Sequence, residues 1–152
     1  MITFKTVRVR DVLPDMVSLL HAHFDEVGHQ KGRNPLDPDY DKYMALDDAG
    51  LLSVVVAYNT NNHLIGYCVD LMMNHLHHKT LSYAVNDVLY VRPEYRRTAV
   101  PLELLNYTGE HLTRLGISVH IIHMKMYKKF QRLAEAAGYD PHEISYLKYL
   151  GA

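Results

Sequence analysis

Three long β-rich segments follow one another in the middle of the chain, and they constrain the fold more than any other feature. Residues 51–58 and 63–73 are rich in β-branched and other apolar side chains, and the turn-forming run Asn59–Asn62 lies between them. This arrangement predicts a β-hairpin. Residues 81–91 predict a third long strand, so consecutive strands form the centre of the fold.

Helical patterns flank this region on both sides. Residues 2–9 alternate as a half-buried strand does, and apolar residues from Met16 to Val27 then recur at helical spacing, with Asp11 as the expected N-cap. A short second helix is expected over 40–49. The second half predicts a helix over 102–115, a buried strand over 117–122, a helix over 126–137 and a final strand over 143–150.

The length and the pattern fit one domain. The chain has 152 residues, enough for one compact core, and shows no internal repeat, low-complexity tract or linker. We therefore expect residues 1–152 to form a single α/β domain with a mixed, largely antiparallel central sheet flanked by helices. An exposed edge on the final strand would make a homodimer plausible.

Charge and cysteine content narrow the class of function. Sixteen basic and seventeen acidic residues give a formal charge of −1, which argues against a generic binder of polyanions, so nucleic acid is not an expected partner. The single Cys68 lies in an apolar run and cannot form an internal disulfide, which favours a reducing compartment. With neither a signal-peptide pattern nor a membrane-length apolar run, we expect a cytoplasmic protein without a membrane partner.

The most informative segment is the end of the third long strand and the loop that follows it. A strand that ends in a basic loop and opens a helix presents free backbone N–H groups at the positive end of the helix dipole, which suits a pyrophosphate. Arg96 and Arg97 add two phosphate donors. A solvated arginine pair on an ordinary loop explains this segment about equally well.

Two motifs of this segment resemble the GNAT superfamily of acetyl-CoA-dependent N-acetyltransferases. Val91-Arg-Pro-Glu-Tyr-Arg96 resembles the strand-end motif of the family, and Arg96-Arg-Thr-Ala-Val-Pro101 falls on its pyrophosphate loop. The resemblance implies acetyl-CoA as co-substrate, with the pantetheine between residues 84–91 and 117–122. The implied contacts are Leu89, Tyr90, Val91, Arg96, Arg97, Thr98, Ala99 and Val100.

The sequence also departs from the family pattern. Ala99 and Pro101 replace the two loop glycines, and Ala134 stands where many members carry a tyrosine that protonates the leaving thiolate. Tyr127 is the nearest substitute by residue type. The His75–His78 run, together with the Gly138-Tyr139 pair that closes the domain, is most similar to phage-encoded members.

The resemblance implies direct acetyl transfer to a primary amine, of a small molecule or of a protein. Asp87 is the acidic residue that could deprotonate the amine. The alternative is that Asp87 is a structural carboxylate at the strand edge, paired with a lysine or an arginine. A β-bulge in this strand would turn Asn86 toward the cleft in its place. The rival hypothesis is a catalytically degenerate GNAT-like binding or inhibitory protein, which the missing loop glycines favour.

Histidines and acidic residues suggest further features of a site. His75, His77 and His78 lack the cysteine or glutamate partners of a metal motif, so no metal is expected and a loop lining the acceptor cleft is preferred. His120 and His123 have apolar neighbours and are expected to be structural. The acidic residues over 25–48 favour a cationic acceptor, although a solvated face explains them as well.

Overall fold

The computed structural model describes residues 1–28, 34–126 and 129–151. The elements are, in chain order, β1 (Thr3–Thr6), α1 (Val9–Val27), α2 (Tyr40–Asp48), β2 (Leu52–Tyr58), β3 (Leu64–His75), β4 (His78–Val91), the short 3₁₀ helix η1 (Pro93–Tyr95), α3 (Val100–Arg114), β5 (Val119–Ile121) and α4 (Gln131–Ala136).

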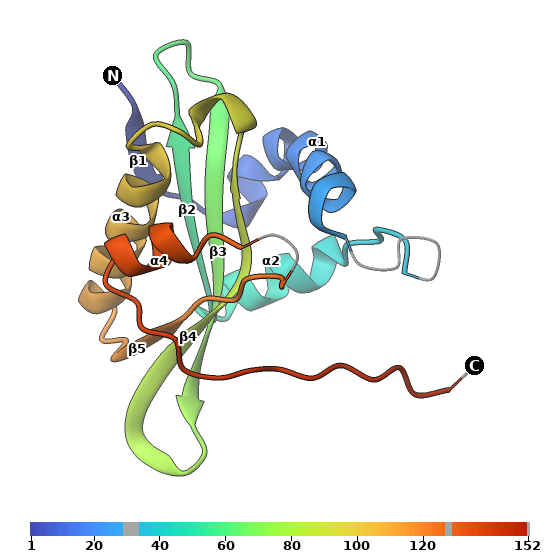
Figure 1. The fold of residues 1–152 in the computed structure, drawn as a ribbon, viewed down its shortest axis with the longest axis vertical. Coiled ribbons are helices and arrows are strands. Elements are labelled where there is room, and N and C mark those ends of the chain that lie inside the picture. The colour runs from blue at the N-terminus through green and yellow to red at the C-terminus, as the bar shows by residue number, and fades with distance from the viewer. Residues whose placement is uncertain (29–33, 127–128, 152) are drawn as a thin grey trace.

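The strands form one five-stranded sheet in the order β1-β2-β3-β4-β5 (Figure 1). Neighbours from β1 to β4 are antiparallel, and β5 is parallel to β4. The helices α1 and α2 cover one face of the sheet, and α3 and α4 cover the other. The predicted fold class, a mixed and largely antiparallel sheet flanked by helices, is confirmed.

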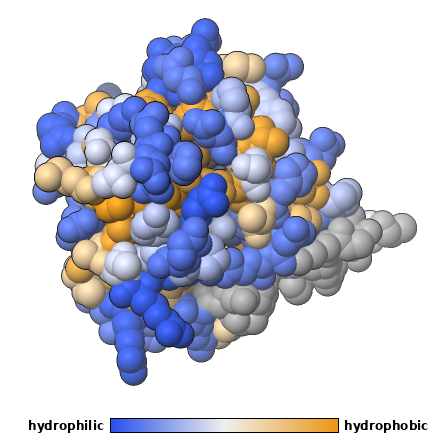
Figure 2. All heavy atoms as spheres, turned by 90° about the horizontal axis from the view of Figure 1, so that it is seen from above, coloured by the Kyte–Doolittle hydropathy of each residue, from blue (hydrophilic) through white to orange (hydrophobic). Residues whose placement is uncertain are grey.

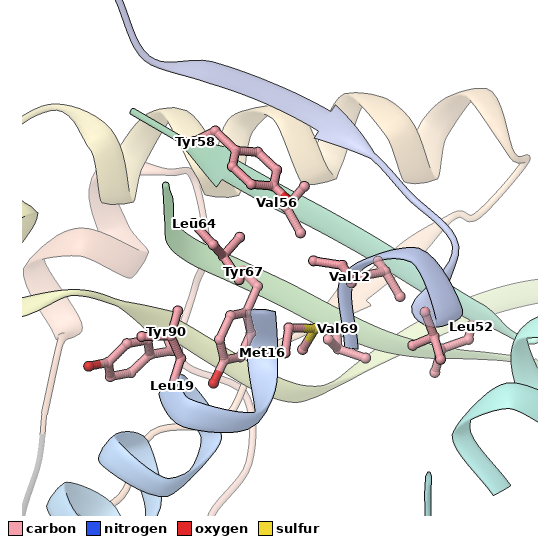
Figure 3. Packing of buried hydrophobic residues seen from close by; sticks show 12 residues of the cluster. Val12, Met16, Leu19, Leu52, Val56, Tyr58, Leu64, Tyr67, Val69 and Tyr90 are labelled. Atoms are coloured by element: carbon pink, nitrogen blue, oxygen red, sulfur yellow. The ribbon is translucent and has the colours of Figure 1, made fainter. Parts of the chain in front are cut away.

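The two faces of the sheet carry two separate cores. Alternate residues of β2 point to opposite sides, so Val54 and Val56 pack under α1 while Val55 and Ala57 pack under α3. On the first face, Met16 of α1 lies against the sheet among the residues drawn in Figure 3. The second core is completed by the buried start of α3.

Helix α1 begins two residues before the predicted N-cap. Its first residue is Val9, and Asp11 lies within the first turn. The carboxylate of Asp47, at the end of α2, accepts a hydrogen bond from the Val9 N–H at 3.0 Å and from Arg8 Nε at 2.7 Å. A residue from a distant segment therefore caps this helix, and the local sequence carries no signal of it.

The prediction of a final strand over 143–150 is wrong. Residues 140–151 form neither helix nor strand, and Ile144, Tyr146, Leu147 and Leu150 are 70–94% exposed. The neighbouring β5 has only three residues, so it offers a short edge for pairing, and the apolar alternation has no sheet to complete it. The exposed strand edge on which the homodimer was expected is thus missing from the described residues.

Two further predictions need correction. The strand expected over 117–122 shortens to β5, and it is partly exposed, with Val119 at 39%. The helix expected over 126–137 is reduced, in its described part, to α4. Across the described ranges, no helix has the length and apolar character that crossing a bilayer demands.

Candidate active site

The sheet opens between β4 and β5. The two strands pair only where Tyr83–Val85 faces Val119–Ile121. Beyond Val85, β4 runs on to Val91 without a β5 partner, because β5 ends at Ile121. After β5, Lys125 forms a single β-bridge. The backbone N–H and C=O groups of β4 beyond Val85 therefore have no partner from β5, and we call this end of the pairing the β4–β5 opening.

A bulge in β4 marks the point where this opening begins. Val88 lies opposite Val69, whereas Asn86 lies opposite Asp70, so Asp87 is the extra residue of the bulge. Asn86 points inward on the α3 side of the sheet and is 8% exposed. Asp87 is exposed, so the bulge directs these two side chains differently, and it is Asn86 that is buried.

The exposed Asp87 is held by the helical layer on the other face. The hydroxyl of Tyr43 in α2 donates a hydrogen bond to Asp87 Oδ2. Burial and the neighbouring carboxylate of Asp87 raise the pKa of Tyr43, so its hydroxyl stays protonated and acts as a donor. Asp87 is therefore an oriented carboxylate, and it is not neutralised by a lysine or arginine in the described contacts.

The loop after β4 opens α3 as the sequence predicts. Pro101 lies in the first turn of the helix, where its missing N–H costs no helical hydrogen bond. The hydroxyl of Thr98 donates to the Tyr95 carbonyl at 2.7 Å and accepts from the Val100 N–H at 3.3 Å. The N-cap itself is Ala99, which offers no side-chain acceptor. Val91 at the end of β4 and Val100 in the first turn of α3 belong to the same core cluster, so the first turn of α3 lies next to the end of β4.

The two arginines of this loop have different surroundings. Arg96 Nε donates to the Val91 carbonyl at 2.7 Å, and its terminal nitrogens contact the two oxygens of Glu26 in α1 at 2.5 and 2.7 Å. The guanidinium also lies over the ring of Tyr90. The hydrogen bond to Glu26 raises the pKa of Arg96. Arg97 is exposed.

The remaining predicted contacts with acetyl-CoA lie at the end of β4, just before this loop. Leu89, Tyr90 and Val91 form the last part of β4, beyond the pairing with β5. Seen from above, the molecule shows a band of hydrophobic side chains between hydrophilic ones (Figure 2). Tyr127, the predicted proton donor, lies outside the described residues.

A separate cavity of about 380 Å³ lies between α1 and Arg92, and none of the predicted site residues lines it.

The histidine cluster lies away from this region. His75 pairs with His78 at the tip of the β3–β4 hairpin, which projects beyond the helices at the end opposite η1 (Figure 1). This tip is about 30 Å from Asp87 along the extended strand. The structure therefore places these histidines far from Asp87, and their place in an acceptor cleft stays a prediction. Within the ranges 1–28, 34–126 and 129–151, no group of three or more His, Cys, Asp or Glu could hold a metal ion.

Part of the acidic segment has structural roles. Asp39 is the N-cap of α2, where its side chain accepts from the Lys42 N–H. Asp47 and Asp48 pair with arginines next to the start of α1. These three carboxylates are therefore engaged in holding the helical layer together.

Sequence reasoning missed a buried hydrogen-bonded chain next to the bulge. Asp70 on β3 is fully buried, and its Oδ1 lies 2.9 Å from Asn86 Nδ2 and 3.0 Å from His120 Nε2. The other ring nitrogen of His120, Nδ1, lies 2.6 Å from the hydroxyl of Tyr139. His120 has hydrogen-bond partners at both ring nitrogens and a side chain that is 10% exposed, as expected of a structural histidine, whereas His123 is exposed. No sequence spacing links these residues, which come from four segments.

Comparisons with known proteins bear on the fold. No protein-family model matches the chain, and no curated protein matches its sequence. An aminoglycoside acetyltransferase from an uncultured soil metagenomic sample, solved in complexes with sisomicin and with trehalose, has a TM-score of 0.79 at 15% identity, over 99% of this chain and 97% of that one.

Two further solved structures have a similar fold. A ribosomal-protein-alanine N-acetyltransferase from Brucella melitensis biovar Abortus 2308 has a TM-score of 0.73 at 14% identity, over 99% of this chain and 100% of that one. A GCN5-related N-acetyltransferase from Ralstonia eutropha JMP134 has a TM-score of 0.76 at 18% identity, with the same coverage. The chain therefore has the fold of the GCN5-related N-acetyltransferases.

Proposed function

We propose that the chain is an acetyl-CoA-dependent N-acetyltransferase that moves an acetyl group to a primary amine by direct transfer in a ternary complex. The observation that carries this proposal is the opening between β4 and β5, which lies beside the first turn of α3. The similarity to solved acetyltransferases over 97–100% of their length supports it.

The residues around the opening fit acetyl-CoA as the co-substrate. The first turn of α3 offers backbone N–H groups and the positive end of the helix dipole to a pyrophosphate, and the exposed Arg97 adds a cation. The edge of β4 beyond its pairing with β5 offers donors and acceptors to the amide groups of pantetheine. The proposed contacts are Leu89, Tyr90, Val91, Arg96, Arg97, Thr98, Ala99 and Val100.

The transfer needs an acceptor for the proton of the attacking amine. We assign this role to Asp87, which is the exposed extra residue of the bulge and is oriented by Tyr43. A backbone N–H of β4 polarises the thioester carbonyl in the manner of an oxyanion hole. Cys68 is fully buried, and burial raises the pKa of its thiol, which supports direct transfer without an acyl-cysteine intermediate.

The acceptor belongs to the class of primary amines, carried by a small molecule or by a protein. Among the similar structures, one acetyltransferase is named for aminoglycosides and another for the alanine of a ribosomal protein. A cationic small-molecule amine is the preferred acceptor, because Asp87 is an exposed carboxylate. The resemblance to phage-encoded members, a cytoplasmic location and a homodimer remain predictions from the sequence.

A second candidate function is a binding or inhibitory protein that has lost the chemistry. Two observations favour it: Arg96 is already paired with Glu26, and the loop lacks both glycines. This candidate predicts that acetyl-CoA binds weakly, or binds without turnover on any amine.

The deciding measurement is the release of free thiol from acetyl-CoA across a panel of polyamines, amino acids, aminoglycosides and peptides. Asp87→Asn should lower kcat/KM by roughly 10²–10⁴-fold, since it removes a proton acceptor. Its affinity for acetyl-CoA should remain close to that of the unchanged protein. Asp41→Asn, the same substitution at an exposed position of α2, is the matched control.

Two outcomes would contradict the proposal. Intact acetyl-CoA binding without turnover on any amine would leave the non-catalytic binding protein as the better account. Turnover that Asp87→Asn reduces no more than the Asp41→Asn control does would remove Asp87 from the mechanism while leaving the transferase activity in place.

A further inference from the structure

The bulge in β4 places two neighbouring polar side chains on opposite faces of the sheet from two different partners. In a regular strand, residues 86 and 88 lie on the same face. Here Val88 packs against the core under α1, whereas Asn86 is buried on the α3 side, where it contacts Cys68. Asp87 contacts Tyr43 of α2 and so lies on the same side as Val88. We call this the acceptor side, because the proposed function has Asp87 receive the amine proton there.

The side chain of Asn86 bonds to the polar groups around the bulge. Its Nδ2 lies 2.9 Å from Asp70 Oδ1, 3.2 Å from the Val69 carbonyl on β3 and 3.2 Å from the Val88 carbonyl on β4. A bulge interrupts the backbone ladder, so carbonyl groups beside it need donors from elsewhere. One buried amide therefore joins both strands at the point where their ladder is interrupted.

A register without the bulge would exchange the positions of Asn86 and Asp87. Val69 pairs with Val88. Continued without a bulge, this register puts Asp87 opposite Asp70, and it moves Asn86 to the acceptor side. Asp70 has no solvent exposure, so a second carboxylate beside it would be both desolvated and repelled. Asp70 therefore favours the amide of Asn86 over the carboxylate of Asp87 as its neighbour in the interior.

The other register without a bulge would break the core under α1. If the pairing of Asn86 with Asp70 continued toward the end of β4, Tyr90 would turn to the α3 side. Tyr90 is 6% exposed and packs in that core against Tyr67, with the ring centroids 5.7 Å apart. Apolar burial thus sets the register after the bulge, and the buried pair of Asn86 and Asp70 sets the register before it.

We propose that Asp70 and Asn86 are positioning residues for the transfer reaction, which maintain the bulge and so keep the carboxylate of Asp87 on the acceptor side. This inference rests on the proposed function. In the exchanged register, the neutral amide of Asn86 would face the amine, and the carboxylate that takes its proton would be buried beside Asp70. The register from Val88 onward would stay the same, so the proposed acetyl-CoA contacts, which begin at Leu89, would remain in place.

The test compares Asp70→Asn with Asp41→Asn, the same substitution at an exposed position of α2. Asn at position 70 keeps an oxygen that can accept from Asn86, but it no longer repels Asp87. Asp70→Asn should lower kcat for thiol release by about 10-fold or more, since only molecules that keep the bulge retain a proton acceptor on the acceptor side. Affinity for acetyl-CoA, measured by calorimetry, should stay unchanged, and Asp41→Asn should change neither quantity.

A double-mutant cycle separates positioning from general damage to the structure. If Asp70 acts through Asp87, Asp70→Asn should cause no further loss of kcat in the Asp87→Asn variant. A purely structural role would lower kcat by the same factor in both backgrounds, and this result would overturn the inference.

Exchanging the two interior residues gives a variant in which activity should return. Asp70→Asn combined with Asn86→Asp restores one carboxylate and one amide to the interior pair. Either register of β4 then leaves a carboxylate on the acceptor side. The combined variant should therefore have a higher kcat than Asp70→Asn alone, and a kcat no higher than that would contradict the role of the Asp70 charge.

The register itself can be measured without substrates, from cross-strand contacts between backbone protons in NMR spectra. In the unchanged protein, residue 70 should lie opposite residue 86. In Asp70→Asn, contacts between residues 70 and 87 should appear, while those between residues 69 and 88 remain. An Asp70→Asn variant that keeps only the first pairing would overturn the inference.

The results separate this inference from the proposed function. Thiol release by the unchanged protein, with Asp70→Asn no slower than Asp41→Asn, would overturn the positioning role and leave the transferase intact. Absence of thiol release with every amine would overturn the proposed function and, with it, any role of Asp70 in the transfer.

Discussion

The loop that follows β4 allows a sharp test of which arginine binds phosphate. Arg96 and Arg97 are adjacent in sequence, and the sequence alone gives them the same role. In the structure, Arg96 joins the end of β4 to Glu26 of α1, whereas Arg97 is exposed. We predict that Arg97→Ala weakens acetyl-CoA binding more than Arg96→Ala does.

The magnitudes follow from the contacts. A charge-assisted contact with phosphate contributes about 1.5–3 kcal/mol, so Arg97→Ala should raise the Kd of acetyl-CoA by about 10- to 100-fold. Arg96 would first have to leave Glu26, which reduces its net gain from a phosphate. Its removal should instead lower the free energy of unfolding by about 1 kcal/mol, a discounted value because its side chain is 35% exposed.

Two measurements check this prediction. Calorimetry with acetyl-CoA gives the Kd of each single variant, and urea unfolding gives its stability. Glu26→Gln serves as the cross-check, since it weakens the hold on Arg96 and should not weaken cofactor binding. Equal losses of affinity in Arg96→Ala and Arg97→Ala, with unchanged unfolding of Arg96→Ala, would refute the separation of roles.

Two predictions concern the core under α1. The hydroxyl of Tyr67 is buried and has no hydrogen-bond partner in the described ranges. Tyr67→Phe should therefore raise the free energy of unfolding by about 1 kcal/mol and the Tm by about 2–4 °C. A loss of stability in urea unfolding would show that the hydroxyl has a hydrogen-bond partner. Burial lowers the pKa of His23 below 6.5, so the folded protein favours the neutral ring. The free energy of unfolding should therefore decrease as the pH falls below 6.5. Urea unfolding on either side of that pH should show a smaller decrease for His23→Gln than for the unchanged protein.

The sequence predicts elements whose signals are local. The β2–β3 hairpin is recovered because the turn residues Asn59–Asn62 lie between two apolar runs, and Asn62 takes the positive φ of 59° that such a turn needs. The strand, loop and helix of the candidate phosphate site are also contiguous in the chain. For this reason the position of the loop is predictable, although the pairing of Arg96 with Glu26 is not.

The failures share one cause, which is dependence on distant partners. Helix α1 starts early because Asp47 caps it from the end of another helix. The alternating residues 143–150 have a strand pattern, but pairing depends on an edge that the short β5 does not supply. The bulge at Asp87 arises from the register of β3 against β4, and the hydrogen-bonded chain that ends at Tyr139 joins residues from four segments, so a single sequence encodes neither locally.

The carboxylate shared by α1 and α2 has a consequence for the dynamics of the acceptor side. Asp47 is 7% exposed and bonds both Arg8 and the first N–H of α1, so undocking either helix leaves buried polar groups of the other unsatisfied. The two helices should therefore open as one cooperative unit in hydrogen exchange. Because Tyr43 belongs to that unit and holds Asp87, the orientation of this carboxylate is tied to the docking of the N-terminal helix, far away in the chain.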